Sequence, residues 1–358
     1  MTVGFLGLGL IGGSIAKCIR EKYPDTIIIA YNRTKDRLKM AIEEGIIDVA
    51  LSDASAGFSD CDIIFICMPV ITAIDYLPLI KTQLKKGAVL TDVGSTKTRI
   101  HEEIAALGMT ECFIGGHPMT GSEKTGYEYS NSLLLENAYY MLTPSEDVPD
   151  EKVRDFEDLI RSLGSLPLVL SYKEHDKVVA AISHLPHLIS ATLVNLVHAE
   201  DSDRHLMKTV AAGGFKDITR ISSSSPAMWQ EICLANGEDI IELLDHYIAM
   251  LRQYRTAISE RNGDALFDIF SECKAFRDSF LSQGRGEYRI YCDIADEEGA
   301  IARIAALLAQ YHISIENIGI VHNREFEQGV LKINFYDKTS LSRAVRTLKG
   351  SGYTIYEN

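Results

Sequence analysis

The chain has 358 residues, a length that predicts two or three domains at roughly 100–200 residues each. Its composition, 46% hydrophobic and 24% charged, is that of a globular protein and excludes a disordered or collagen-like chain. With 36 basic against 50 acidic residues the net charge is −14, which argues against binding to nucleic acid or to an anionic membrane, because both need clustered Lys and Arg.

The sequence shows no uninterrupted run of 18 apolar residues, so we expect no membrane-spanning helix. The N-terminal stretch MTVGFLGLGLIGG lacks a basic segment and predicts a strand and a turn rather than a signal peptide. The seven cysteines are scattered and form no CxxC pair, which argues against a disulfide scaffold and against a zinc ribbon. We therefore expect a reduced, cytoplasmic protein without a metal site.

The first part of the chain alternates apolar runs with amphipathic stretches. Strand-like runs bounded by turns occur at 3–6, 27–31, 63–67, 89–93, 112–114, 139–142 and 168–170. Helix-like segments lie at 11–22, 35–44, 73–84, 96–107 and 151–162. This alternation predicts an α/β domain of the Rossmann type, with a parallel, doubly wound sheet, over residues 1–171.

A second part, residues 172–283, loses the strand-like alternation. Long helical patterns replace it at 175–200, 228–236, 240–260 and 264–281. These lengths predict an all-α domain, and their apolar content is too high for isolated helices. A domain of this kind often buries its surplus apolar face against a second copy, so we expect a homodimer.

A third part follows a predicted linker at 282–286, which holds two glycines among polar residues. Residues 287–358 show the order strand, helix, strand, strand, helix, strand. The segments are 288–294, 300–311, 313–321, 329–336, 340–350 and 353–356. This βαββαβ order predicts a ferredoxin-like unit.

A glycine-rich segment, GLGLIG, follows the first predicted strand and opens the first predicted helix. In such a segment the first glycine permits a tight turn, the second lets the backbone approach a pyrophosphate, and the third lets the helix pack on the strand. The phosphates then lie at the helix N-terminus, where free N–H groups favour anions. We therefore predict a dinucleotide site formed by Gly7, Leu8, Gly9, Leu10, Ile11 and Gly12.

The end of the second predicted strand bears on the choice of cofactor. An acidic residue there would bind the ribose 2′-hydroxyl and repel a 2′-phosphate, but this chain has Asn32 and then Arg33. Asn32 is neutral, and Arg33 could pair with a phosphate or stack on adenine, which favours NADP or the use of both NAD and NADP. The alternative is that Arg33 is a solvated loop charge.

Two polar segments follow the fourth and fifth predicted strands, DVGSTK at 92–97 and GGHPMTGSE at 115–123. Both lie at the carboxyl ends of strands, where open α/β sheets bind ligands. Two glycines and a proline flank His117, which suits a rigid loop that presents one imidazole.

Two further segments lie in the predicted helical domain. In the HLPH segment, His184 and His187 share one helix face, but no carboxylate or Cys has the spacing of a third ligand, so we do not expect a metal there. The segment GGFKDITRI at 213–221 is followed by Trp229.

These motifs occur in the order found in prephenate dehydrogenases with a C-terminal ACT domain, and the chain resembles that family over essentially its whole length. GxGxxG alone is shared by many families, whereas HPMTGSE, HLPH and GFKDITR together are specific to this one. The resemblance implies oxidative decarboxylation of prephenate to 4-hydroxyphenylpyruvate in L-tyrosine biosynthesis, with NAD or NADP as cofactor.

The same resemblance implies roles for individual residues. His117 would accept the proton of the substrate hydroxyl, since histidine can accept a proton near neutral pH, and Ser95 would orient that hydroxyl. Arg220 would bind a substrate carboxylate through its planar guanidinium. Lys216 and Asp217 either form an ion pair that positions Arg220 or belong simply to the loop. The remaining substrate-binding candidates are His184, His187, Ser122 and Glu123, the last as a gate or an electrostatic partner.

The C-terminal segment 296–299, followed by 313–318, is similar to the ACT pattern, in which an Asp-x-x-Gly turn opens the first helix. The resemblance implies feedback inhibition by L-tyrosine, with Gly299 and Asn317 as the contacts. The alternative is a domain that only dimerises. The turn lacks the proline often found before this glycine.

Other functions stay open at this point. An arogenate or cyclohexadienyl dehydrogenase would differ only in the pocket for the substrate side chain. A 3-hydroxy-acid dehydrogenase would need a catalytic Lys early in the helical domain, where Lys173 and Lys177 are merely possible by position, and it leaves HPMTGSE unexplained. A non-enzymatic NAD(P)-dependent regulator is disfavoured because every candidate catalytic residue is present.

Overall fold

The computed structural model describes residues 1–121, 124–282, 288–294, 297–321 and 329–357. Two compact units divide the chain, Met1–Ala249 and Met250–Asn358. The boundary between them falls inside helix α11 (Gly237–Ser259), so the helical region predicted at 172–283 contributes to both units.

Five parallel strands form the central sheet of the first unit in the order β3-β2-β1-β4-β5. Their bounds are β1 Thr2–Leu6, β2 Ile27–Tyr31, β3 Val49–Leu51, β4 Ile63–Ile66 and β5 Val89–Asp92. The order reverses between β1 and β4, and open α/β sheets bind ligands at the carboxyl ends of the strands beside such a reversal. The polar segments after β1 and β5 therefore emerge at the edge where a ligand is expected.

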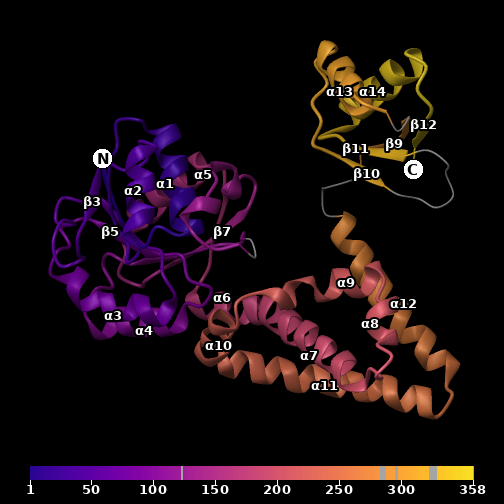
Figure 1. Cartoon of the computed structure of the whole chain (residues 1–358), viewed down its shortest axis with the longest axis horizontal. Coiled ribbons are helices and arrows are strands. Elements are labelled where there is room, and N and C mark those ends of the chain that lie inside the picture. Colours follow the sequence, from indigo (N-terminus) through magenta and orange to yellow (C-terminus); the bar gives the residue numbers. More distant parts are fainter. Residues whose placement is uncertain (122–123, 283–287, 295–296, 322–328, 358) are drawn as a thin grey trace. The chain divides into compact units, whose positions relative to one another are not determined.

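Helices cover both faces of this sheet, which makes the first part Rossmann-like as predicted (Figure 1). On one face lie α1 (Leu10–Lys22), α2 (Lys35–Glu43) and α5 (Asp150–Ser162), and on the other lie α3 (Val70–Lys81) and α4 (Thr98–Ala106). Each face has its own apolar cluster; in the first, the rings of Phe5 and Phe65 stack with centroids 5.2 Å apart. Burial on both faces explains why β4 is an unbroken apolar run rather than an alternating one.

A second, three-stranded sheet extends the first unit, in the order β6-β7-β8. Its strands are β6 (Ile114–Pro118), β7 (Tyr139–Pro144) and β8 (Leu166–Val169). β6 runs antiparallel to β7, with His117 opposite Met141. The sequence suggested that His117 lies on a loop, but ladder pairing with β7 extends β6 through this residue, so a strand holds the imidazole.

A long helix opens the helical region and carries four histidines, His175, His184, His187 and His198. It consists of α6 (Tyr172–Val179), a π-helical turn (Ala180–His184) and α7 (Leu185–Glu200). Ser171 and Glu174 form a capping box at its start. The wider turn accompanies Pro186, which has no N–H to give to the preceding turn; such π-turns are frequent at functional sites. The remaining elements of this unit are α8 Leu206–Val210, α9 Gly213–Thr219, α10 Pro226–Ala235 and short 3-10 turns at Tyr127–Tyr129, Ser132–Leu135 and Arg220–Ser223.

The same helix, Tyr172–Glu200, is the one helix in the described ranges that is long and apolar enough to cross a membrane by length and composition. The sequence argument from uninterrupted apolar runs did not single it out. Within the unit, however, His175, Asp176 and His184 of this helix are almost fully buried and are hydrogen-bonded to other side chains. These contacts are those of a helix in the core of a folded domain.

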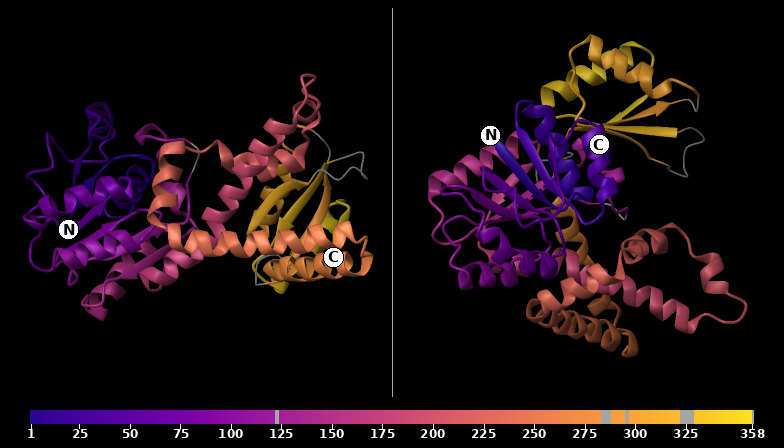
Figure 2. Two further views of the ribbon diagram at one scale, coloured as in Figure 1. Left: turned by 90° about the horizontal axis from the view of Figure 1, so that it is seen from below. Right: turned by 60° about the vertical axis from the view of Figure 1, so that its left-hand side comes forward.

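The second unit contains a four-stranded antiparallel sheet in the order β10-β11-β9-β12. Helices α13 and α14 lie together on one face of this sheet (Figure 2), where the apolar side chains of Ile290, Ile304, Leu331 and Leu348 are fully buried. The predicted linker lies, from residue 283 on, outside the described residues. The elements of this unit are α12 Gly263–Ser282, β9 Arg289–Ile294, α13 Ala300–Gln310, β10 Asn317–Val321, β11 Gly329–Asn334, α14 Lys338–Gly350 and β12 Ile355–Glu357.

Candidate active site

The glycine-rich turn between β1 and α1 is shaped for close approach. Gly7 has a φ of +95°, and a Cβ atom there would lie 2.5 Å from the carbonyl oxygen of Cys67. A Cβ on Gly12 would lie 2.5 Å from the carbonyl oxygen of Gly7. A Cβ on Gly9, by contrast, would meet nothing within 4 Å. The first and third glycines therefore let the backbone pack tightly, and the second leaves open space beside the helix start.

That open space fits the pyrophosphate of a dinucleotide. Gly9 is the N-cap of α1 and no side chain caps the helix, so N–H groups of its first turn are available to an anion. No acidic residue lies in the first turn to compete for them. Leu8 is buried in the core, whereas Leu10 and Ile11 are partly exposed at the helix start.

Asn32 ties the glycine-rich turn to the end of β2. Its Oδ1 accepts a hydrogen bond from the backbone N–H of Leu8 at 3.0 Å, and its Nδ2 donates to the carbonyl of Thr34 at 2.9 Å. The residue is only 8% exposed, so its amide is committed to the protein backbone. Arg33 is exposed and has no hydrogen-bond or ion-pair partner in the described part of the chain, which leaves its guanidinium free for a ligand.

Asp92, at the end of β5, joins the two polar segments that sequence analysis singled out. Its Oδ2 accepts from the N–H of Gly94 at 2.8 Å and pairs with Nζ of Lys97, while its Oδ1 accepts from the N–H of Gly116 at 3.1 Å. Burial lowers the pKa of Lys97, against the opposing effect of Asp92. This one carboxylate therefore holds the turn that carries Ser95 and the strand that carries His117 at the same edge of the sheet.

A chain of side chains leads inward from His117. Its Nδ1 lies 2.8 Å from Nε2 of His175, and Nδ1 of His175 lies 2.7 Å from Oδ1 of Asp176. Asp176 also accepts from the backbone N–H groups of Lys97 and Thr98, each at 2.8 Å. Burial lowers the pKa of His117 well below its usual value, with further lowering by His175 and Lys97, so its imidazole is neutral at physiological pH.

His117 opens into a cavity of about 690 Å³. The cavity brings Ser95 and His117, from the α/β part, together with His184 and Arg220 of the helical part. Lys216, which sequence analysis did not assign to the substrate, also lines it. The other lining residues are Pro118, Met119, Thr120, Gly121, Ser183, Ile221, Ser223, Ser224, Met228, Trp229 and Ile232. Two imidazoles, five hydroxyls and two cations line this cavity beside apolar side chains, and such a lining can hold a small anionic substrate with an oxidisable hydroxyl.

Several predicted residues are placed differently from expectation. His187 is not among the described residues that line the cavity; its ring stacks on Trp229, with centroids 3.5 Å apart, and so lies behind the indole. Lys216 and Asp217, both in the described part of the chain, form no ion pair, because adjacent positions on α9 do not face each other. Ser122 and Glu123 lie outside the described residues.

His184 is held by Asn236, whose Nδ2 lies 3.2 Å from Nδ1 of the ring and also donates to the backbone carbonyl of Asp176 at 2.8 Å. Burial lowers the pKa of His184 to about 4. Its Nε2 is buried and has no partner in the described residues, which leaves one polar atom for a ligand. The described residues offer no group of three His, Cys, Asp or Glu that could hold a metal ion.

Sequence reasoning missed Asp92, Lys97, His175, Asp176 and Asn236 as parts of the site. The first two stood in a motif that was singled out for Ser95. A signal for His175 existed: the Ser171–Glu174 capping box fixes the helix start, which places His175 and Val179 on one face four residues apart. No local pattern marks Asp176. Nothing local to Asn236 marks it.

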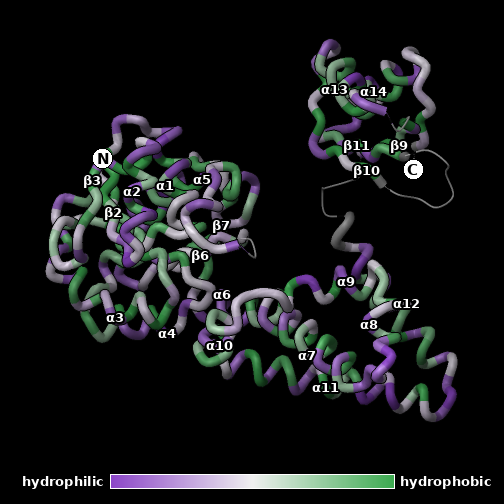
Figure 3. Tube along the Cα trace, in the orientation of Figure 1, coloured by the Kyte–Doolittle hydropathy of each residue, from purple (hydrophilic) through white to green (hydrophobic). Residues whose placement is uncertain are grey.

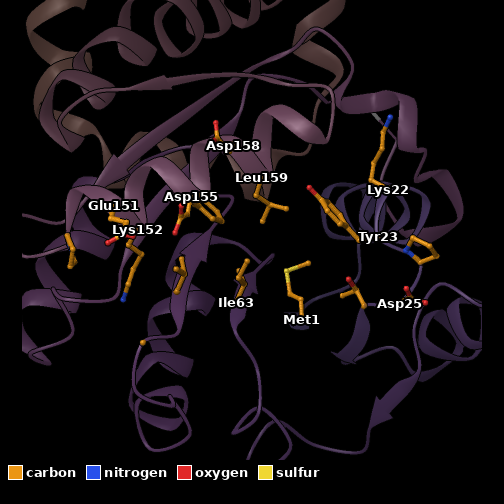
Figure 4. A pocket seen from close by; sticks show the side chains of 16 residues that line it. Met1, Lys22, Tyr23, Asp25, Ile63, Glu151, Lys152, Asp155, Asp158 and Leu159 are labelled. Carbon is orange, nitrogen blue, oxygen red and sulfur yellow. The ribbon is translucent and has the colours of Figure 1, made fainter.

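A larger hollow of about 1020 Å³ lies at the opposite, amino-terminal edge of the parallel sheet. Figure 4 shows Met1 and Ile63, at the starts of β1 and β4, facing Asp155 and Leu159 of α5. The catalytic candidates all lie at the carboxyl-terminal edge, where open sheets bind ligands, so this hollow is not the active-site candidate.

Comparison with known proteins identifies the family to which the chain is similar. The family profile for the prephenate dehydrogenase nucleotide-binding domain matches residues 15–166, and the profile for the prephenate dehydrogenase dimerization domain matches residues 171–272. A prephenate dehydrogenase of Bacillus subtilis (strain 168) is 35% identical over 354 residues, which cover 97% of this chain and 95% of the relative.

Two solved structures are similar as well. Prephenate dehydrogenase from A. aeolicus, in complex with hydroxyphenyl propionate and NAD+, superposes with a TM-score of 0.74 and 28% identity, over 78% of this chain and 98% of that one. Arogenate dehydrogenase from Synechocystis superposes with a TM-score of 0.70 and 30% identity, over 78% of this chain and all (100%) of that one.

Proposed function

This chain belongs to the prephenate dehydrogenase family of NAD(P)-dependent oxidoreductases, and from that premise we propose that it converts prephenate to 4-hydroxyphenylpyruvate in L-tyrosine biosynthesis. The observation that carries the proposal is one cavity lined by His117 and Ser95 and also by Lys216 and Arg220. Prephenate has a ring hydroxyl at one end and carboxylates at the other, so it needs a base and cations on opposite walls of one site.

A bound NAD(P) supplies the acceptor for the hydride that leaves the hydroxyl-bearing ring carbon. His117 accepts the hydroxyl proton through Nε2, since its Nδ1 faces His175. Ser95 orients that hydroxyl from the turn that Asp92 holds. Arg220 pairs with a carboxylate and fixes the far end of the substrate, and Lys216 adds a second cation. Loss of carbon dioxide from the opposite ring carbon returns its bonding electron pair to the ring, which becomes aromatic.

The other substrate candidates have supporting roles in this proposal. The free Nε2 of His184 hydrogen-bonds the substrate from the wall, and His187 supports that wall by stacking on Trp229. Ser122 and Glu123, which follow β6 in the sequence and lie outside the described residues, stay substrate-binding candidates on their motif alone. The cofactor pyrophosphate binds the turn from Gly7 to Gly12, and Arg33 contacts the adenosine end.

A second candidate substrate is L-arogenate, because the similar Synechocystis enzyme is an arogenate dehydrogenase. The two substrates differ in a keto against an amino group on the side chain. Initial rates of cofactor reduction, with prephenate and L-arogenate each crossed against NAD and NADP, decide between them. Turnover of prephenate supports the proposal, and turnover of arogenate alone replaces the substrate. No turnover in any combination, from folded protein that binds cofactor, contradicts it.

For the C-terminal unit we propose a ferredoxin-like ACT domain that binds L-tyrosine and inhibits the enzyme. The sheet order β10-β11-β9-β12, with both helices on one face, supports this assignment. Gly299 precedes α13 in a left-handed conformation, and Asn317 begins β10. The domain boundaries we propose are 1–171 for cofactor binding, 172–283 for the helical part and 287–358 for regulation.

We further propose that the helical part forms a homodimer in the cytoplasm. Large apolar residues are exposed on several of its helices, for example Leu196 of α7 at 55%, Leu234 of α10 at 73% and Ile241 of α11 at 61%. Figure 3 shows hydrophobic stretches along α7 and α11. Exposed apolar surface of this extent is usually covered by a partner, and the match to a dimerization-domain profile supports a second copy as that partner.

A further inference from the structure

His117, His175 and Asp176 form a row of hydrogen bonds in which each donor points toward Asp176. We infer that His175 and Asp176 are positioning residues that set the protonation of His117 and take over the positive charge it acquires. The inference rests on the proposed role of His117 as the base. Two hydrogen bonds support it: His117 Nδ1 lies 2.8 Å from His175 Nε2, and His175 Nδ1 lies 2.7 Å from Asp176 Oδ1.

Asp176 sets the direction because it is an ionised acceptor. Its Oδ1 and Oδ2 accept from the backbone N–H groups of Lys97 and Thr98, which open helix α4. Burial raises the pKa of Asp176, but hydrogen bonds from His175 and Thr98 outweigh burial, so its pKa lies below the usual value. An ionised carboxylate has no proton to donate.

The tautomers follow from this one fact. Since Asp176 only accepts, Nδ1 of His175 carries the proton between them. A neutral imidazole has one N–H, so Nε2 of His175 is an acceptor, and Nδ1 of His117 must be the donor to it. Nε2 of His117 is then left with a free lone pair, which is the atom that the substrate hydroxyl needs.

The same row of hydrogen bonds can move the positive charge that proton uptake creates from His117 to His175. A proton taken up at Nε2 makes His117 a cation in a region where burial, Lys97 and His184 all disfavour it, and where the Asp92 carboxylate is paired with Lys97. The Nδ1 proton of His117 can pass over 2.8 Å to Nε2 of His175. The charge then lies on His175, and His117 is neutral again. Burial lowers the pKa of His175 as well, but there the hydrogen bond and the charge of Asp176 oppose burial, whereas no carboxylate of the described residues does so at His117.

The proton balance closes after product release. His175 first returns its Nε2 proton to Nδ1 of His117, and the resulting His117 cation then loses its Nε2 proton to water in the cavity. One proton has entered from the substrate hydroxyl and one has left to solvent, so both histidines regain their starting tautomers.

Three variants test the relay by steady-state kinetics over a range of pH. In Asp176→Asn and His175→Gln we expect kcat to fall at least 100-fold, within the range of about 10²–10⁴ that a positioned base contributes, with KM for NAD(P) within twofold. In Asp176→Asn the acidic limb of the kcat profile should also move to lower pH, because the His117 cation has lost its counter-charge. Glu174→Ala, which weakens only the helix cap, should leave both kcat and that limb unchanged.

A readout without substitution covers the case in which these variants do not fold. In 15N-histidine-labelled wild-type protein, the imidazole chemical shifts of His117 and His175 should both report the Nδ1–H tautomer. An Nε2–H tautomer at His117 overturns the relay.

The kinetic outcomes separate the relay from the base assignment. If His117→Asn abolishes turnover while His175→Gln and Asp176→Asn keep wild-type kcat and the same acidic limb, His117 is the base and the relay is wrong. If His117→Asn retains turnover, the base assignment and the relay both fail.

Discussion

The side chains of Asp92 and Lys97 form an ion pair in which neither is more than 2% exposed. Asp92 also accepts hydrogen bonds from the backbone N–H groups of Gly94 and Gly116. It therefore fixes the backbone next to Ser95 and next to His117. A buried pair of this kind adds little net stability over apolar residues, but removal of one partner leaves an uncompensated charge. The segments that carry Ser95 and His117, the proposed catalytic residues, thus both depend on the Asp92 carboxylate.

Replacement of Asp92 by Asn should therefore destabilise the fold. We expect the free energy of unfolding to fall by about 3 kcal/mol, since breaking a buried pair from one side costs about 3–5 kcal/mol and Lys97 can lose its proton in part. Urea denaturation measures the change. Glu43→Gln is the control, because the exposed Lys39–Glu43 pair should contribute less than about 1 kcal/mol. Equal, small losses in the two variants would contradict this account.

Much of the fold could be predicted from sequence because its strands and helices have strong periodic patterns. The runs at 3–6 and 27–31 became β1 and β2 nearly to the residue. β3 was missed because it has three residues, two of them exposed, and gives neither an apolar run nor an alternation. The strand predicted at 112–114 lies too early in the sequence, because β6 runs over Ile114–Pro118 and its glycines and proline had indicated a loop.

The site was predicted where motifs mark it and missed where only tertiary contact creates it. Ser95, His117 and Arg220 stand in recognisable segments and meet in one cavity. Asp176 accepts a hydrogen bond from the backbone N–H of Lys97, although the two residues are 79 positions apart in the sequence. No local pattern in either segment predicts that bond. The same holds for the stacking of His187 on Trp229, which removes a predicted lining residue from the cavity.

Arg33 should decide how well the enzyme uses NADP. It is exposed beside the Asn32 side chain that fixes the glycine-rich turn, and a guanidinium can pair with a 2′-phosphate through two hydrogen bonds. In Arg33→Ala we expect KM for NADP to rise about tenfold, or about 1.4 kcal/mol in binding, with KM for NAD changed less than twofold. Initial rates with each cofactor measure both constants.

Arg37→Ala is the matched control for that experiment. Arg37 lies on α2 and pairs with Glu128 at 3.5 Å, so its loss removes the same charge from a nearby surface. A rise in KM for NADP in both variants would indicate a general loss of positive charge. No change in Arg33→Ala would make Arg33 a solvated charge.

Gly299 allows a specific test of the proposed inhibition by L-tyrosine. Its φ of +80° at the N-cap of α13 is strained for any other residue, so Gly299→Ala must shift the turn. We expect the concentration of L-tyrosine for half inhibition to rise about tenfold, a loss of about 1.4 kcal/mol, while activity without tyrosine is retained.

Gly352→Ala controls for backbone strain in the same unit. Gly352 has a φ of +87° after α14, and a Cβ atom there would meet nothing within 4 Å, so the two substitutions should cost similar stability. Inhibition curves for both variants separate ligand contact from general strain. Unchanged inhibition in Gly299→Ala, or an equal change in both variants, would leave this turn without a role in binding.

Ile241 tests the proposed dimer. The side chain is 61% exposed on α11, and a carboxylate placed in an apolar interface loses its hydration without a partner. We expect Ile241→Glu to shift the sedimentation coefficient from that of a dimer to that of a monomer at micromolar concentration. Leu133→Glu, at a side chain 70% exposed outside the helical part, should leave the dimer intact. If both variants remain dimers, the interface does not include Ile241.

His101 makes the stability of the fold depend on pH. It is 5% exposed, stacks on Tyr172 with ring centroids 4.5 Å apart and contacts the hydroxyls of Thr143 and Ser145 at 3.0 and 3.3 Å. Burial, with a further contribution from Lys97, lowers the pKa of His101 to about 3. In the unfolded chain the ring titrates at about 6.5. Between these two values the unfolded state binds a proton that the folded state does not.

The free energy of unfolding should therefore be highest above pH 6.5 and fall as the pH is lowered, by up to about 1.4 kcal/mol per pH unit for this histidine. His101→Gln keeps a polar side chain but cannot titrate, so the variant should be less stable at pH 7 yet show a shallower decline from pH 6.5 to 5. Urea denaturation at intervals of half a pH unit gives both slopes. Because carboxylates protonate in both proteins, only the difference between the slopes reports on His101.

His246→Gln, at an exposed position of α11, should keep the wild-type slope. Parallel curves for wild type and His101→Gln would mean that His101 titrates alike in the folded and unfolded states.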